Sequence, residues 1–171
     1  IDHVMAMHRL YWIPDNMGQA EGTYVDAPSE ELFAVLNLES HRNTCEIVGE
    51  DLGTVPRGTG EALARHRIRG MYLAEFEAGS AAPVSPPPHT RVALIGSHDT
   101  PTFAGWLGGV DIEERVRIGL LNDTAAARER QARREAVHRL ASALGVDPGD
   151  PAEFLSSVIE WLGGSDSPLV I

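Results

Sequence analysis

The chain contains three short apolar runs with acidic or imidazole side chains at or directly beside their carboxyl ends. They are "TCEIVGE" at 44–50, "GMYLAEF" at 70–76 and "RVALIGSHD" at 91–99. Short runs that are apolar almost throughout are typical of strands buried on both faces of a sheet. The pieces "IDHV" at the start of the chain and "SPLVI" at its end have the same character. We therefore expect short parallel strands with polar residues beyond their carboxyl ends.

Helical patterns separate these runs. We expect helices over 29–42, 56–66, 102–108, 112–122, 125–144 and 151–163, a helical turn within 6–14 that Pro14 closes, and a loop over 15–28. Strands that alternate with helices define an α/β architecture, either an open parallel sheet or a (β/α)₈ barrel. The carboxyl ends of such strands share one rim, where active sites lie. The polar residues expected on that rim are Asp2, His3, Glu50, Asp51, Glu75, Glu77, His98 and Asp99.

The charge balance limits the possible partners. The 171 residues include 14 basic and 25 acidic side chains, so the net charge is −11. Such a surface repels phosphate backbones, and nucleic acid is therefore an unexpected partner. All basic residues other than His are Arg, which excludes a Schiff-base or P-loop lysine. We interpret the five Arg at 128, 130, 133, 134 and 139 as the solvated face of a helix.

Membrane and redox signals are sparse. No apolar run reaches the roughly 18 residues that a membrane span needs, so we expect no membrane partner. Cys45 is the single cysteine and cannot form an internal disulfide. It falls in an apolar, strand-like run, which fits a reducing compartment, and we predict a cytoplasmic location.

Three carboxylates on one rim, Asp2, Glu50 and Asp99, suit glycoside chemistry. One carboxylate can attack the sugar carbon, a second can protonate the departing oxygen, and a third can stabilise positive charge. The two working groups of a retaining enzyme lie about 5 to 5.5 Å apart, and neighbouring strands lie about 4.8 Å apart. Acidic residues at strand ends also cap helices and bind backbone amides, so spacing alone leaves both interpretations open for each residue.

Four motifs favour the catalytic interpretation. "IDHVMAMHRLYWIP", "VGEDLGTVP", "RGMYLAEFE" and "IGSHDTPTFAGW" resemble, in order and approximate spacing, those of the 4-alpha-glucanotransferase (amylomaltase) family of the alpha-amylase clan. The resemblance is closest over residues 1–109. It implies that the chain forms part of a (β/α)₈ (TIM) barrel, roughly strands four to eight with their helices.

The resemblance also implies roles for individual residues. Asp2 corresponds to the nucleophile, Glu50 to the general acid/base and Asp99 to the transition-state stabiliser. His3 and His98 would bond the sugar hydroxyls, and Trp106, in the matched "GW", would line the site. The substrate would be an α-1,4-glucan or malto-oligosaccharide, and no cofactor or metal is implied.

Several positions depart from the family pattern. Thr100 and Pro101 replace residues that are commonly Asn and an acid, and Glu75 replaces a common Gln. These departures leave substrate preference more open than reaction class. We further expect one incomplete catalytic barrel domain over 1–171, truncated at both ends, which would associate with itself or with a missing N-terminal part.

The leading hypothesis is transfer of α-1,4-glucan segments between oligosaccharides by a retaining double displacement, although the fragment alone could be inactive. One alternative is a metal-dependent hydrolase with His3, His98, Asp2 and Asp99 as ligands. The sequence lacks the paired His spacings that would place two metal ligands on one helix or strand. A second alternative is a module that binds glucan without turning it over.

Overall fold

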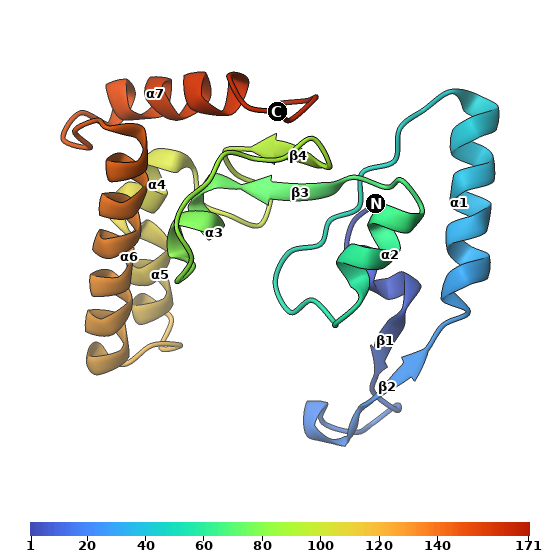
Figure 1. Cartoon of the computed structure of the whole chain (residues 1–171). Helices are drawn as coiled ribbons and strands as arrows, with labels where there is room; N and C mark the ends of the chain where they lie inside the picture. Colours follow the sequence, from blue (N-terminus) through green and yellow to red (C-terminus); the bar gives the residue numbers. More distant parts are fainter. The chain divides into compact units, whose positions relative to one another are not determined.

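The computed structural model describes residues 1–171 and has the expected mixed α/β character. The chain forms two compact units, Ile1–Met71 and Tyr72–Ile171. Figure 1 labels the helices and strands. The elements of the first unit are η1 (Val4–Met7), β1 (Arg9–Trp12), η2 (Gln19–Glu21), β2 (Thr23–Asp26), α1 (Ser29–Asn43) and α2 (Thr59–Arg65). Strand β3 (Gly70–Leu73) contains the boundary, and α3 (Ala74–Gly79), β4 (Arg91–Leu94), α4 (Phe103–Gly108), α5 (Val110–Arg117), α6 (Asp123–Leu144) and α7 (Pro151–Gly163) follow.

Residues 9–26 of the first unit differ from the sequence prediction, whereas the short helical turn η1 overlaps the start of the turn predicted within 6–14. In place of the rest of that turn and the loop, residues 9–26 form the antiparallel hairpin β1–β2, in which Tyr11 pairs with Tyr24. The two rings meet edge to face at 5.1 Å, and the Arg9 guanidinium lies 4.0 Å from the centre of the Tyr24 ring. Aromatic cross-strand pairs stabilise hairpins. The prediction gave more weight to the Gly and acidic residues than to the β-forming stretches "LYW" and "TYV". It was therefore wrong for residues 9–26.

Three segments of the first unit lie side by side in parallel. The Ile1 nitrogen donates to the Val48 carbonyl at 2.6 Å, and the Glu50 amide donates to the Ile1 carbonyl at 2.9 Å. On its other side, the 48–50 segment contacts Arg69: Val48 pairs in parallel with Arg69, and the Gly49 amide donates to the Arg69 carbonyl at 2.8 Å. The expected strand at 44–50 is thus reduced to a single bridge residue, but its parallel pairing is confirmed.

The core of the first unit gathers around Phe33 of α1. Phe33 is fully buried, and the His66 ring stacks on it at 4.9 Å. The buried side chains packed around it are Val4, Met5, Ala62, Leu63 and Ile68. Helix α1 agrees with the predicted range 29–42. Helix α2 begins later than predicted, at Thr59, because Gly58 in front of it adopts a left-handed φ of 88°.

The strands of the second unit are shorter than predicted. Strands β3 and β4 pair in one small sheet, and Ala93 of β4 pairs in parallel with Val170. Residues 74–76, which were expected to extend a strand, begin helix α3 instead. Strand β4 ends at Leu94, before the polar residues of the predicted run 91–99.

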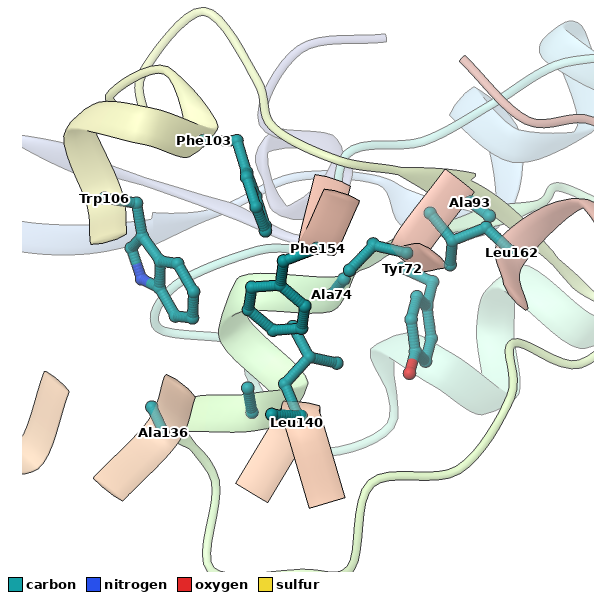
Figure 2. Close-up of a cluster of buried hydrophobic side chains, with 12 residues drawn as sticks. Tyr72, Ala74, Ala93, Phe103, Trp106, Ala136, Leu140, Phe154 and Leu162 are labelled. Carbon is teal, nitrogen blue, oxygen red and sulfur yellow. The ribbon is translucent and has the colours of Figure 1, made fainter. Parts of the chain in front are cut away.

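Five helices cover the remainder of the second unit and enclose its apolar core. Figure 2 shows Phe154 of α7 beside Leu140 of α6 and Phe103 of α4, and the Phe103 and Phe154 rings lie 5.5 Å apart. Capping residues explain where three of these helices begin: the side chains of Thr102, Asn122 and Asp150 each accept a backbone amide of α4, α6 and α7 in turn. Helix α5 starts at Val110 and ends at Arg117, five residues before the predicted end.

Two predictions about polar groups need correction. Cys45 is exposed and lies outside any strand, because the pairing of its segment is confined to Val48. The Arg cluster on α6 is only partly a solvated face. Arg130 pairs with Glu113 and Arg133 pairs with Asp111, both on α5, and Arg139 donates to the Ala78 carbonyl at 2.9 Å. These contacts tie α6 to its neighbours.

Candidate active site

The first unit brings three predicted site residues together: Asp2, His3 and Glu50. The backbone pairing of segments 1–4 and 48–50 places them, because the Val4 amide donates to the Glu50 carbonyl at 2.9 Å. Both segments run in the same direction, so their polar ends meet at one edge. Asp2, His3 and Glu50 therefore lie at neighbouring positions of the two paired segments, and their catalytic roles stay predictions.

The Glu50 carboxylate is held by a backbone group. The His3 amide donates to Oε2 of Glu50 at 2.7 Å. This geometry depends on His3 adopting a left-handed conformation with φ 47°, directly before η1. Non-glycine residues adopt this region infrequently, and such residues concentrate at functional sites. His3 therefore contributes its amide to the site, which the sequence-based role for its imidazole did not include.

The close approach of the two segments requires a glycine at position 49. A Cβ atom placed on Gly49 would lie 2.8 Å from Cγ2 and 3.0 Å from Cβ of Val4, well inside normal contact distance. Val4 is fully buried and cannot swing away. Gly49 thus allows the segment carrying Asp2 and His3 to pack against the segment carrying Glu50.

Asp2 and Asp51 differ sharply in burial. Asp2 is exposed, so its carboxylate is open to solvent. Asp51 is only 8% exposed, and its Oδ1 accepts the Met71 amide at 2.8 Å. An exposed carboxylate can reach a substrate, whereas a buried, bonded one is a structural group.

His98 and Asp99 lie in the second unit, in the turn that follows β4. Both side chains are 71% exposed, and Nε2 of His98 lies 3.4 Å from Oδ2 of Asp99. Thr100 closes this turn: its Oγ1 accepts the Ser97 amide at 2.8 Å and donates to the Ser97 carbonyl at 3.1 Å. The departure from the family pattern at this position therefore has a local structural role.

Trp106 is part of the core of the second unit. Its side chain is 5% exposed and packs beside Phe103, as Figure 2 shows, and the Arg133 guanidinium lies 5.4 Å from its ring centre. This burial favours a packing role for the indole. A contact between Trp106 and substrate stays a prediction.

Glu75 has a more unusual environment than the sequence indicated. It sits in the first turn of α3, is 4% exposed, and its Oε1 is buried without a hydrogen-bond partner. Burial raises the pKa of the Glu75 carboxyl to about 7, the nearby Arg133 charge lowers it in part, and Asp111 raises it. Its burial follows from the packing of α3 against α6, which the strand predicted over 70–76 did not contain.

Two further observations concern metal ions and membranes. No group of three or more His, Cys, Asp or Glu side chains is arranged to hold a metal ion. None of the helices combines the length and the apolar character needed to cross a membrane.

Comparison with known proteins gives a consistent result. The sequence profile of the 4-alpha-glucanotransferase family matches residues 1–171. A 4-alpha-glucanotransferase of Haemophilus influenzae is 40% identical over 124 residues, which cover 71% of this chain and 18% of that protein. One of Mycobacterium bovis is 30% identical over 184 residues, which cover 99% of this chain and 25% of that protein.

Comparison with solved structures points to the same family. The crystal structure of amylomaltase from Corynebacterium glutamicum superimposes with a TM-score of 0.81 at 29% identity and covers 99% of this chain and 27% of that one. The architecture is thus that of an α/β protein similar to an amylomaltase. The chain belongs to the 4-alpha-glucanotransferase family. It spans about a quarter or less of the length of the two bacterial relatives.

Proposed function

We propose that the protein containing this chain transfers α-1,4-glucan segments between oligosaccharides by a retaining double displacement. One observation carries the proposal: in a member of this family, Asp2 and Glu50 lie at the same end of two paired parallel segments. Neighbouring strands are about 4.8 Å apart, close to the roughly 5 to 5.5 Å between the carboxyl groups of retaining enzymes.

The proposed reaction has two displacement steps. Asp2 attacks the anomeric carbon, while Glu50 gives its proton to the departing glycosidic oxygen and becomes a carboxylate. The Glu50 carboxylate then takes a proton from the hydroxyl of an acceptor sugar, whose oxygen displaces Asp2. A new α-1,4 bond forms and both carboxyl groups return to their starting states.

The remaining site residues keep the roles that the resemblance implies. Asp99 would stabilise the developing positive charge on the sugar, and His3 and His98 would bond its hydroxyls. The exposure of His98 and Asp99 supports these roles, because a substrate can reach both side chains. No cofactor takes part in this scheme, and we also propose a cytoplasmic location.

We further propose that the chain contributes strands to a (β/α)₈ barrel. Three parallel pairings support this architecture: Ile1 with the 48–50 segment, Val48 with Arg69, and Ala93 with Val170. The polar residues of the site follow these pairings in the chain, as they do at the catalytic rim of such barrels.

Disproportionation of maltotriose tests the proposed function. We expect Glu50→Gln to lower the rate by at least about 10²-fold, because a neutral amide cannot exchange the proton. Glu31→Gln, on the exposed surface of α1, serves as the matched control and should leave the rate unchanged. Chromatography of the products gives the rates. A Glu50→Gln variant as active as the control would remove Glu50 from the role and overturn the proposal.

A further inference from the structure

Glu50 and Asp51 are neighbours in sequence, but their carboxylates bind backbone amides of two different segments. Oε2 of Glu50 accepts the His3 amide at 2.7 Å, and Oδ1 of Asp51 accepts the Met71 amide at 2.8 Å. Segment 48–50 pairs with the chain start on one side and with Arg69 on the other. The two acids therefore reach opposite neighbours of the same segment.

Asp51 does not serve as a helix cap, a role that acidic residues after a strand often have. Helix α2 begins at Thr59 behind Gly58 and has no side-chain cap. The turn that follows Asp51 is made by Gly53, whose φ is 79°. The Asp51 carboxylate instead lies buried against the segment that carries Met71.

The burial of Asp51 makes its hydrogen bond a strong restraint. Removing a carboxylate from water is costly unless hydrogen bonds compensate it, so the side chain stays where the Met71 amide holds it. A single planar peptide bond joins Asp51 to Glu50. The Glu50 carbonyl in that peptide accepts the Val4 amide at 2.9 Å, so this backbone is held on both sides.

We propose that Asp51 is a positioning residue, whose buried carboxylate on the Met71 amide fixes the backbone that presents Glu50 to its site. The inference rests on the proposed acid/base function of Glu50. A displacement of about 1 Å at a catalytic group can reduce a rate about 10²-fold. Asp51 acts through Glu50 and does not contact the substrate.

The test compares Asp51→Ala with Asp51→Asn in the protein that contains this chain, assayed on maltotriose. Asn keeps an oxygen acceptor for the Met71 amide, and Ala removes it. We expect Ala to lower kcat at least about 10-fold with KM within about twofold, and Asn to keep kcat within about threefold of wild type. The dependence of kcat on pH should keep its wild-type shape in the Asn variant. Asp15→Ala, at an exposed position, is the control and should match wild type.

Hydrogen exchange of the Met71 amide provides a direct structural measurement. It should accelerate in the Ala variant and stay slow in the Asn variant. The inference is overturned if Ala retains wild-type kcat, if Ala changes only KM, or if Asn shifts the pH profile. If the Ala variant does not fold, the Asn variant decides alone, and a kcat below about a tenth of wild type overturns the inference.

The proposed function and this inference fail in different ways. An active Glu50→Gln variant would overturn both the proposed function and the inference. An inactive Glu50→Gln variant beside a fully active Asp51→Ala variant removes only the positioning role.

Discussion

At the scale of single residues, the candidate site depends on backbone groups as much as on side chains. The His3 amide binds Glu50 and the Met71 amide binds Asp51. Gly49 allows the two segments to approach because its missing Cβ leaves room for Val4. A site assembled in this way is sensitive to substitutions that change no catalytic atom.

Gly49→Ala tests this dependence. The added methyl would overlap Val4, so we expect a loss of about 1 to 3 kcal/mol in the free energy of unfolding. The rate of maltotriose disproportionation should fall with it, because segment 1–4 must shift away from Glu50. Gly60→Ala, a position with open space around it, is the control and should cost nothing. Urea unfolding and rate measurements check both variants, and equal behaviour of the two would contradict the expectation.

At the scale of elements, two ion pairs that differ in solvent exposure join α5 to α6. Arg133 and Asp111 form a two-pronged pair at 2.8 and 3.0 Å, with side chains 16% and 28% exposed. Arg130 and Glu113 make a similar pair at 2.7 and 2.9 Å that is more open to solvent. Arg133 also donates to the Trp106 carbonyl and so reaches α4 as well.

Removing the acid from each pair should lower the free energy of unfolding by unequal amounts. Asp111→Ala leaves the Arg133 guanidinium partly buried without its charge partner, and we expect a loss of about 2 to 3 kcal/mol in unfolding free energy. Glu113→Ala should produce a much smaller change, because water replaces its partner. Urea midpoints of the two variants, compared at low and high salt, measure the difference. Equal losses would show that burial does not set the strength of these pairs.

Glu75 should make the stability of the second unit depend on pH. Burial raises the pKa of its carboxyl from 4.5 to about 7, so the folded chain retains the proton where the unfolded chain has released it. The stability contribution is therefore fully present below pH 4.5 and is lost as pH rises toward 7. This corresponds to about 3 kcal/mol.

Glu75→Gln removes this titration while preserving the shape of the side chain. Relative to the variant, the wild-type chain should lose stability between pH 4.5 and 7 and change no further above that range. Urea midpoints of both chains measured from about pH 4 to pH 8 test the expectation, since the difference between them cancels groups that titrate in both. Parallel curves would contradict it.

At the scale of the whole molecule, family membership agrees with four motifs that are visible in the sequence. The profile of the 4-alpha-glucanotransferase family covers residues 1–171, and an amylomaltase structure superimposes over 99% of the chain. The chain spans about a quarter or less of the length of its bacterial relatives. For this reason the activity is proposed for the protein that contains the chain.

The sequence predicted helices better than strands for a local reason. Helices α1, α6 and α7 agree with their predicted ranges within one or two residues, because capping residues and apolar periodicity act within one element. Pairing partners far apart in the chain decide where strands begin and end. The hairpin β1–β2 and the early start of α3 at Ala74 were therefore missed.

The sequence by itself determined the α/β class and the family, because these depend on residue types and their order, and it proposed Asp2, Glu50 and Asp99 as the candidate catalytic carboxylates. Only the tertiary structure decided that the amide of His3 binds Glu50, that Asp51 is buried against Met71, and that Glu75 and Trp106 lie inside the second unit. Such features depend on backbone conformation and on burial by distant segments. Both are set when the elements pack together, which local patterns of residues do not encode.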